Sequence, residues 1–492
     1  MAGFIWLFGS IIESNTMKIS IRLLLLLTSL YIVSPIILFL FCWTNVWIGT
    51  ILMLGTGHIL RSQLKKMRND IFFISPKTVF ITTVLIILWT VLSGAGHRGI
   101  FSGDYYKHNA LFNDLISLRW PVQYRLKEVG DIVYLVYYFA YYLPSALIGK
   151  WLGWQAGNIA LFAWTLGGIS LVFLWLYSFI NKQKQLWYGL LFLLFSGLDG
   201  VGKLIMRDKV VNTEWEWWGR NWQYSGNTTL FFYVPQQALI SWLLMGMLLY
   251  IFIKQKILPL QFLLLSASLL WSPFVFLGIL PYYLFLLIKR KFSLSTLEIV
   301  VSVIILCVEA LFLVSNMTFF SKATSANGWL WQTEKIFGSW VLLRLVLFYM
   351  FEFGLFAYFI YHYLFRKNRT TEFIIFIISL ILLFFIPWYK IGLMNDFAMR
   401  ASMPALYVIC YFWIRALIEV KKSQLMALIM IVLFTASSLY PLILLSNGVT
   451  HFSFLSPRYT LAHLEGLNIR KQYLGYADSF FFSLFHSPSI IQ

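Results

Sequence analysis

Charged side chains are scarce in this chain of 492 residues, since Asp, Glu, Lys and Arg together make up only 12% of it. Soluble domains carry about 25% charged residues, so this composition excludes an ordinary soluble protein. Cysteine is rarer still, and Cys42, Cys307 and Cys410 are the complete set. All three lie in apolar segments, at spacings that fit neither a disulfide framework nor a metal-ligand cluster, so we expect them to be packing residues.

Several catalytic motifs are missing as well. The chain contains neither the HExxH pair of zinc proteases nor the GxSxG turn of serine hydrolases, so nothing supports those two enzyme classes. It also has no internal repeat, no low-complexity segment and no linker that would separate a soluble domain.

Apolar residues are abundant instead: 60% of the chain is hydrophobic and 19% is aromatic. Apolar runs near 20 residues long, enough to cross a hydrocarbon core of about 30 Å, recur throughout the sequence. They predict an all-α fold, a polytopic bundle of about 12–14 transmembrane helices with short helices in its outer loops. The expected spans lie near residues 20–41, 43–60, 77–95, 131–149, 157–180, 186–198, 229–253, 259–288, 297–315, 340–364, 373–389, 403–420 and 424–445.

The net charge of +19 comes largely from short basic clusters between these runs. Such clusters mark cytoplasmic loops, so we interpret the charge as a topology signal and expect no nucleic-acid partner. The clusters are Arg61, Lys65, Lys66 and Arg68; Lys182 and Lys184; Lys254 and Lys256; Lys289, Arg290 and Lys291; Arg366, Lys367 and Arg369; Lys421 and Lys422.

This topology predicts an integral, multi-pass protein of the cell (inner) membrane. We expect one transmembrane domain over 1–445 and an extracytoplasmic tail, 446–492, packed on its outer face. The outer loops of the domain are expected at 96–130, 198–228, 316–339 and 390–402.

One segment conflicts with the topology. Residues 131–180 resemble two spans, yet the outer loop before them and the basic loop after them demand an odd number of crossings. Either the tyrosine-rich run from Tyr134 to Tyr142 lies in the membrane interface, or Lys182 and Lys184 are outside.

The first outer loop holds the densest run of chemically capable side chains. In a helix, Asp104, Lys107, His108, Leu111 and Asp114 share one stripe, because residues three, four and seven apart lie on the same face. This stripe is typical of a catalytic loop. A solvated helix beside the membrane with internal salt bridges fits the spacing equally well.

The second outer loop is rich in tryptophan. Trp217 and Trp218, with Glu214 and Arg220 around them, are the residue types of a sugar-binding cleft, where aromatic faces stack on pyranose rings. An interfacial aromatic belt is the alternative. The preceding Gly197–Lys203 nearly matches a phosphate-binding P-loop, but Leu204 stands where a Ser or Thr is needed, so we predict a glycine-rich turn.

A third loop carries Lys390, Asp396 and Arg400. Arg400 is a candidate phosphate ligand, whereas its spacing from Asp396 also predicts a mutual ion pair. Charges inside apolar runs are costly, so Glu309, Arg344 and Glu352 predict either a proton relay or buried structural pairs.

Together these residues resemble the GT-C superfamily of membrane glycosyltransferases, which take sugars from polyprenyl-phosphate donors. The matching features are the first long outer loop with Asp104 in Gly-Asp-Tyr-Tyr-Lys-His-Asn, Trp120-Pro121, the segment from Tyr141 to Lys150, and Arg400 in a later loop. The shared layout covers roughly 77–445. Two features depart from the family: its paired acids often stand close together, whereas Asp114 lies ten residues after Asp104, and two apparent extra spans precede the loop.

The resemblance implies transfer of a sugar from a polyprenyl-phosphate donor to a glycan, lipid or protein acceptor, beside membrane lipids. The first-loop acid, here Asp104, acts in that family as general base or binds a metal, so a divalent cation is an open cofactor question, although no metal ligand is assigned. A transporter or flippase for lipid-linked saccharides and a glycan polymerase or ligase are the alternative functions.

We assign the remaining roles by chemistry, since a carboxylate must deprotonate the attacking hydroxyl and cations must stabilise the leaving phosphate. The expected catalytic residues are Asp104, His108 and Asp114. The expected donor-phosphate ligands are Lys107, Arg119, Lys390 and Arg400. The expected sugar or acceptor ligands are Glu214, Trp217, Trp218, Arg220 and Asp396.

Overall fold

The structure is a computed structural model. It describes residues 16–96, 103–125, 132–206, 214–289, 295–318, 327–333, 339–367, 370–392, 395–419, 424–453, 458–463 and 471–485. For Gly103, Asp104, Ser339 and Gln424 it describes the backbone alone.

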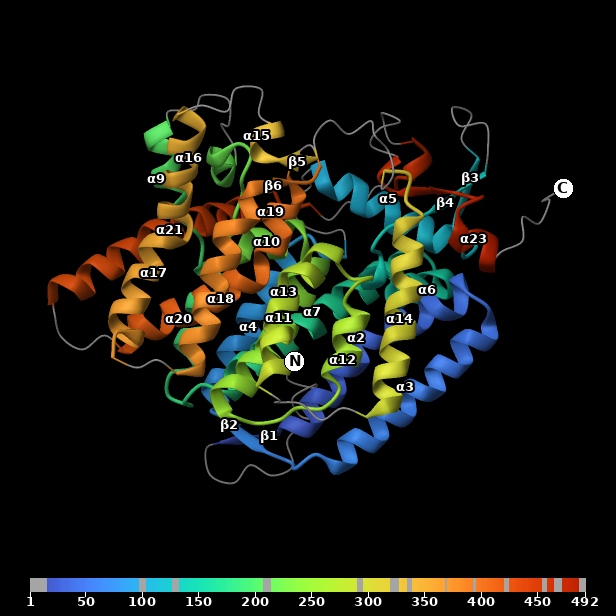
Figure 1. Cartoon of the computed structure of the whole chain (residues 1–492), viewed down its shortest axis with the longest axis horizontal. Coiled ribbons are helices and arrows are strands. Elements are labelled where there is room, and N and C mark those ends of the chain that lie inside the picture. Colours follow the sequence, from blue (N-terminus) through green and yellow to red (C-terminus); the bar gives the residue numbers. More distant parts are fainter. Residues whose placement is uncertain are drawn as a thin grey trace.

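The described elements form a helical bundle with a few short strands (Figure 1). The α-helices are α2 (Ile21–Trp43), α3 (Val46–Lys66), α4 (Pro76–Leu92), α5 (Gly103–Ser117), α6 (Leu143–Leu152), α7 (Trp154–Ser178), α8 (Gln185–Leu194), α9 (Asp199–Met206), α10 (Asn227–Tyr233), α11 (Pro235–Lys254), α12 (Gln261–Ala267), α13 (Pro273–Ile288), α14 (Thr296–Val314), α15 (Leu330–Thr333), α16 (Ser339–Tyr349), α17 (Leu355–Ile360), α18 (Thr371–Phe385), α19 (Asp396–Ala401), α20 (Met403–Glu419), α21 (Gln424–Thr450) and α23 (Phe480–Phe485). Short 3-10 or π-helical segments are η1 (Ala140–Tyr142), η2 (Trp215–Gly219), η3 (Met350–Gly354), η4 (Tyr361–Phe365), η5 (Ile386–Trp388) and η6 (Leu461–His463). The strands are β1 (Met17–Ser20), β2 (Ile71–Ile74), β3 (Gln123–Arg125), β4 (Ile132–Leu135), β5 (Gly328–Trp329), β6 (Tyr389–Lys390) and β7 (Leu474–Tyr476).

The predicted all-α, polytopic membrane fold is confirmed. Within the described ranges, 8 helices are long and apolar enough to cross a membrane, and two shorter apolar helices, Pro76–Leu92 and Pro273–Ile288, accompany them. The long ones are Ile21–Trp43, Trp154–Ser178, Gln185–Met206, Pro235–Lys254, Thr296–Val314, Trp340–Phe365, Thr371–Trp388 and Leu425–Thr450. The number is lower than the 12–14 spans expected, because several apolar runs are broken into pieces.

The conflict over residues 131–180 has a structural explanation. The expected span 131–149 is not a helix: it consists of β4, η1 and the start of α6. With only 10 residues, α6 is about 15 Å long and cannot cross the hydrocarbon core, which is about 30 Å thick. One crossing, α7, therefore remains, and the tyrosine-rich run packs inside the protein, where Tyr134, Tyr141 and Tyr142 are 2–5% exposed.

Two breaks within apolar runs are closed by buried glutamates of α14. Between α12 and α13 the chain leaves the helix, and the freed N–H of Leu270 donates to Glu309 Oε2 at 3.0 Å. At the other end of α12, the N–H groups of Phe262 and Leu263 point at Glu298. The two glutamates are eleven residues apart, three helical turns, and so share one face of α14. In this way α14 holds both ends of the short helix α12.

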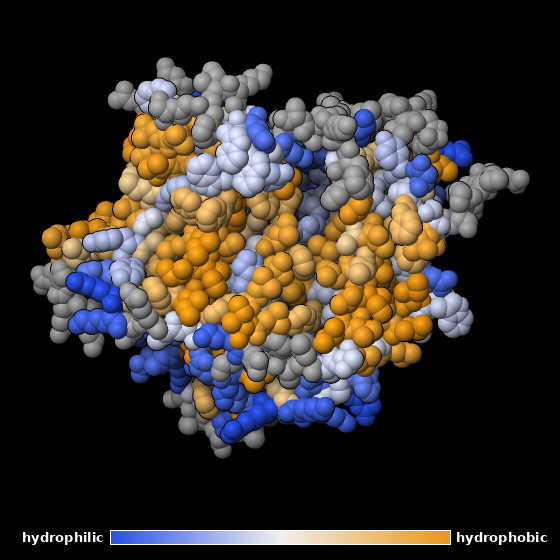
Figure 2. All heavy atoms as spheres, in the orientation of Figure 1, coloured by the Kyte–Doolittle hydropathy of each residue, from blue (hydrophilic) through white to orange (hydrophobic). Residues whose placement is uncertain are grey.

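The two ends of the bundle differ in polarity. Apolar residues form a band across the middle of the molecule, and hydrophilic residues gather at its lower edge, where β1 and β2 lie (Figure 2). We call this edge the basic face, because Lys65 and Lys66 end α3 there and Lys256 binds Asp70 at 3.2 Å. The elements α5, α9, α15, β3 and β4 lie at the opposite face (Figure 1).

The C-terminal tail packs on that opposite face. Strand β7 pairs antiparallel with β4, placing Val133 opposite Tyr476. The side chains of Phe481 and Phe482 in α23 are fully buried, and Phe482 stacks on Tyr134 with ring centroids 3.9 Å apart. The helix α21 runs to Thr450 and so includes the first five residues of the expected tail, 446–450.

Asp114 connects this tail to α5, so its removal should loosen the tail. The buried carboxylate accepts hydrogen bonds from Tyr124 at 2.8 Å and from the N–H of Leu461 at 2.9 Å. Asp114→Ala leaves these donors unsatisfied and should cost about 2–3 kcal/mol of local stability. Hydrogen exchange followed by mass spectrometry should show faster exchange in 458–463. Ser117→Ala, on the exposed side of α5, is the control, and equal exchange in both variants would contradict the assignment.

Candidate functional site

The helix α5 follows α4 and lies on the face opposite the basic one (Figure 1). Its predicted stripe starts at the surface and ends in the core: Lys107 and His108 are half-buried, whereas Leu111 and Asp114 are 1% and 2% exposed. This gradient differs from the solvated helix considered as an alternative. Asp104 belongs to the first turn of α5, and its side chain lies outside the described residues.

Asp114, predicted as a catalytic carboxylate, is buried and hydrogen-bonded in the structure. Burial raises the pKa of its carboxyl, and hydrogen bonds from Thr460, Leu461 and Tyr124 oppose the shift. Because the tail covers the group and supplies these donors, its role is to fix the tail to α5. Burial of this kind depends on a segment nearly 350 residues away and could not be predicted from spacing.

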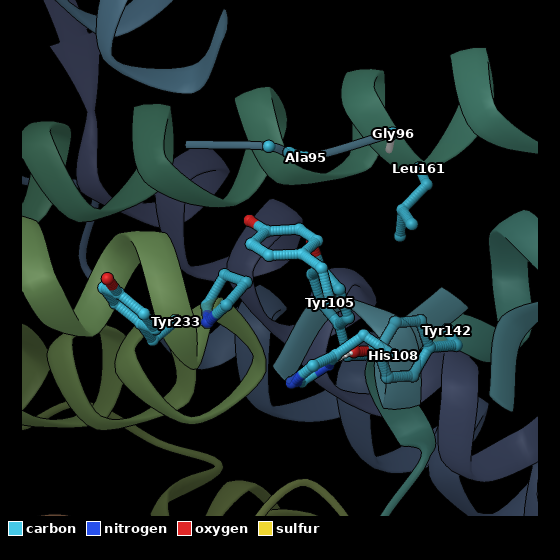
Figure 3. Close-up of a pocket in the computed structure, with 10 residues that line it drawn as sticks. Ala95, Gly96, Tyr105, His108, Tyr142, Leu161 and Tyr233 are labelled. Carbon is cyan, nitrogen blue, oxygen red and sulfur yellow. Dashed lines mark hydrogen bonds between the residues drawn. The ribbon is translucent and has the colours of Figure 1, made fainter. Parts of the chain in front are cut away.

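A small pocket lies beside His108 (Figure 3). His108 Nδ1 and the Tyr142 hydroxyl form a hydrogen bond at one side of it, and Tyr233 lies at the other. The Tyr105 hydroxyl donates to the carbonyl oxygen of Phe232 at 2.8 Å, which ties α5 to α10. The pocket has a volume of about 20 Å³, room for a water molecule or a single hydroxyl group. It is lined by Gly94, Ala95, Gly96, Tyr105, His108, Tyr141, Tyr142, Leu161, Tyr233 and Pro235.

Arg400 contacts the same tyrosine run at Tyr138. It donates to the Tyr138 hydroxyl at 2.6 Å and forms an ion pair with Asp396 at 3.1 Å, so the predicted i,i+4 pair is present. The rings of Tyr138 and Tyr137 stack with their centroids 3.8 Å apart. The centroids of the Tyr137 ring and the Tyr473 ring of the tail are 4.6 Å apart. Burial raises the pKa of Tyr138 and the Arg400 guanidinium lowers it. The net shift is upward, so the hydroxyl keeps its proton at neutral pH and can donate a hydrogen bond.

The other predicted phosphate ligands are spread out. Lys390, in β6, reaches Asn221 Oδ1 at 3.4 Å, and Asn395 donates to the carbonyl oxygen of Asn221 at 2.8 Å. These contacts hold the loop before Arg400 against the tryptophan-rich loop. Arg119 is exposed just beyond the end of α5.

Trp218, predicted as a sugar or acceptor ligand, packs inside the protein. The Trp218 ring is 1% exposed, and its Nε1 donates to Glu352 Oε1 at 2.9 Å. A Cβ at Gly202 would lie 2.4 Å from this ring, so the glycine makes room for it. Trp217 and Glu214 are half-buried and Arg220 is exposed, so these three lie nearer the surface.

Three buried carboxyl groups interact with one another next to Trp218. Among them, only Glu352 was identified from the sequence. The others are Asp199, at the start of α9, and Glu216 in η2; the three are 1–2% exposed. Ser196 donates to Asp199 at 2.9 Å, while Glu216 accepts from Thr229 at 2.5 Å. The sequence feature that could have indicated this cluster was Asp199 in the P-loop-like run Gly197–Lys203, since a charge in an apolar context is costly.

Glu216 belongs to a loop and has an unusual affinity for protons. Burial, followed by repulsion from Asp199, raises its pKa from the ordinary 4.5 to about 8. The donors Thr229, Ser225 and the N–H of Gly226 oppose this shift.

Two members of the predicted relay of Glu309, Arg344 and Glu352 have different partners. Glu309 bonds the backbone at Leu270, whereas Glu352 bonds Trp218, so the two glutamates serve different structural partners. Among the residues that the structure describes, no group of three or more His, Cys, Asp or Glu could hold a metal ion.

Comparison with family models, with curated proteins and with solved structures finds no significant match for this chain.

Gly197 is predicted to be required for the carboxyl cluster. A Cβ there would lie 2.0 Å from Glu352 Oε2, so Gly197→Ala must displace the buried carboxylate. Overpacking of this kind costs about 1–3 kcal/mol. Thermal unfolding of the purified protein should show a lower Tm. Gly167→Ala is the matched control, because a Cβ there has nothing within 4 Å. A Tm as high as that of the control would argue against close packing at Gly197.

The raised pKa of Glu216 predicts a pH-dependent stability. The folded protein holds this proton where the unfolded chain has released it, so the free energy of unfolding falls as pH rises from about 4.5 through about 8. The slope is at most about 1.4 kcal/mol per pH unit. Glu216→Gln should flatten the decline, measured as Tm at several pH values. An unchanged slope in the variant would show that other groups cause it.

Proposed function

We propose that this chain is a membrane glycosyltransferase that moves a sugar from a polyprenyl-phosphate donor to an acceptor, at the face opposite the basic one and in the cell membrane. The observation that carries the proposal is the convergence of two distant helices on one tyrosine run. Arg400 of α19 bonds Tyr138, and His108 of α5 bonds Tyr142. Tyr138 and Tyr142 are close enough to interact electrostatically.

The part of the tyrosine run that Arg400 contacts, at Tyr138, suits a leaving phosphate. A guanidinium presents its N–H donors in a planar fork that matches phosphate oxygens. Asp396, whose side chain is 42% exposed, occupies part of this fork in the structure. An arriving phosphate competes with this carboxylate for Arg400, and the protonated Tyr138 hydroxyl adds a second donor.

The part of the tyrosine run that His108 contacts, at Tyr142, suits proton transfer. A sugar hydroxyl is a weak nucleophile, so a carboxylate must take its proton during attack on the anomeric carbon. Asp104 precedes His108 by four residues on α5, which places both on one face of the helix. We assign Asp104 as the base, and His108, held by Tyr142, as the group that positions the acceptor hydroxyl.

A transporter or flippase for lipid-linked saccharides is the second candidate. It is favoured by the broken run between α12 and α13, since discontinuous helices and buried carboxylates at membrane depth are common in transporters. Here Glu309 closes the break with a hydrogen bond to Leu270. Transport predicts movement of the saccharide across the membrane without cleavage from its phosphate.

The test is transfer by the purified full-length protein given a panel of polyprenyl-phosphate sugars, with release of the sugar measured. Asp104→Asn should lower the rate by about 10²–10⁴ because the base is lost. Arg400→Gln should lower it by about 10² because leaving-group stabilisation is lost. Both variants should retain the wild-type Tm within a few degrees.

Two exposed residues supply matched controls. Asp478→Asn removes an exposed tail carboxylate, and Arg61→Gln removes an exposed arginine of α3 at the basic side. Both should keep full activity. Wild-type rates in Asp104→Asn would remove this residue from the mechanism, and intact saccharides appearing across the membrane of vesicles would favour the transporter.

A further inference from the structure

Asp199 and Glu352 are brought together by two irregular segments. Asp199 starts α9 just after the break that separates it from α8, and Glu352 lies in the π-helical segment η3. The N–H of Leu198 donates to the carbonyl oxygen of Phe351 at 3.0 Å, which joins the two segments directly. Turns of π-helix within α-helices occur frequently at functional sites.

The two carboxyl groups face each other. Each has one oxygen with a donor: Ser196 donates to Asp199 Oδ2 at 2.9 Å, and Trp218 donates to Glu352 Oε1 at 2.9 Å. The other two oxygens, Asp199 Oδ1 and Glu352 Oε2, are buried and have no such donor. The side chains nevertheless lie within hydrogen-bonding reach of one another.

Within the described ranges no Lys, Arg or His forms an ion pair with either carboxyl group of this pair, and Lys203 of α9 lies over the Trp215 ring instead, at 5.6 Å. The titratable side chains that interact with the pair are Glu216 of η2, Tyr224 of the following loop and Tyr440 of α21. Arg344 lies two turns before Glu352 on α16.

We propose that Asp199 and Glu352 form a membrane-buried protonation site, in which one proton is held between Glu352 Oε2 and Asp199 Oδ1. Two facing carboxylates cannot both ionise in a medium of low dielectric constant, because their repulsion and the loss of hydration are large. One shared proton turns the two unsatisfied acceptors into a hydrogen bond. The pair then carries a single negative charge, and the proton belongs to the pair rather than to either residue.

The site does not depend on the pocket of the proposed enzyme. Tyr440 interacts electrostatically with Asp199, with Glu216 and with Tyr233, and Tyr233 lines the pocket. The proton site would exist equally in a transferase or a transporter.

Infrared spectroscopy of the full-length protein in nanodiscs tests the proposal, since the C=O stretch of a protonated carboxyl is resolved from that of a carboxylate. At neutral pH, Glu352→Gln should remove one protonated carboxyl from the spectrum. Asp199→Asn relieves the repulsion and should lower the titration midpoint of the remaining group by about one pH unit or more. Both amides can keep the hydrogen bond, so both variants should fold.

Glu309→Gln is the matched control, because Glu309 is equally buried but bonds a backbone N–H rather than a second carboxyl. The variant Glu309→Gln should leave the titration midpoint of the Asp199–Glu352 pair unchanged. The proposal is overturned if neither Asp199→Asn nor Glu352→Gln alters the protonated band. It is also overturned if sodium, replacing potassium in the buffer, abolishes the band, because a cation would then occupy the space between the oxygens.

Discussion

The absence of water in the apolar band is the constraint on which the rest of the structure depends. Every backbone or side-chain polar group freed by a helix break must find its partner within the chain. The N–H of Leu270 donates to Glu309, and Asn227 donates to the carbonyl oxygen of Phe192 at 2.7 Å. Trp218 donates to Glu352. These few hydrogen bonds allow the chain to leave and re-enter helices within an apolar bundle.

The same breaks position the side chains that carry chemistry. The chain turns between α10 and α11, and Tyr233 and Pro235, on either side of this turn, both line the pocket. The break between α8 and α9 places Asp199 in the interior, and the π-helical turn does the same for Glu352. Irregular segments thus place Asp199 and Glu352 in the interior, whereas the regular helices α5 and α19 carry His108 and Arg400.

Periodicity and composition were sufficient for what depends on neighbours in the sequence: the apolar helices, the basic face and α5. They were insufficient where the partner is distant. The run 131–149 is apolar enough for a span, yet its first part forms the strand β4, which pairs with β7 of the tail. Trp218 resembled a cleft residue because its burial depends on Glu352, 134 positions away. The sequence assigned Asp199 no role, because its partner Glu352 lies in the distant segment η3.

The location of the acids also determines what the net charge means. Within the described part of the chain, six acidic residues, of the 19 in the whole sequence, are at most 2% exposed. These are Asp114, Asp199, Glu216, Glu298, Glu309 and Glu352. At most 13 acidic residues therefore remain at the surface to balance the 38 Lys and Arg. The surface is thus more basic than the composition indicates, and juxtamembrane basic residues attract anionic lipid headgroups by about 1 kcal/mol each. Burying acids inside the bundle therefore increases the net attraction of the protein surface to such headgroups.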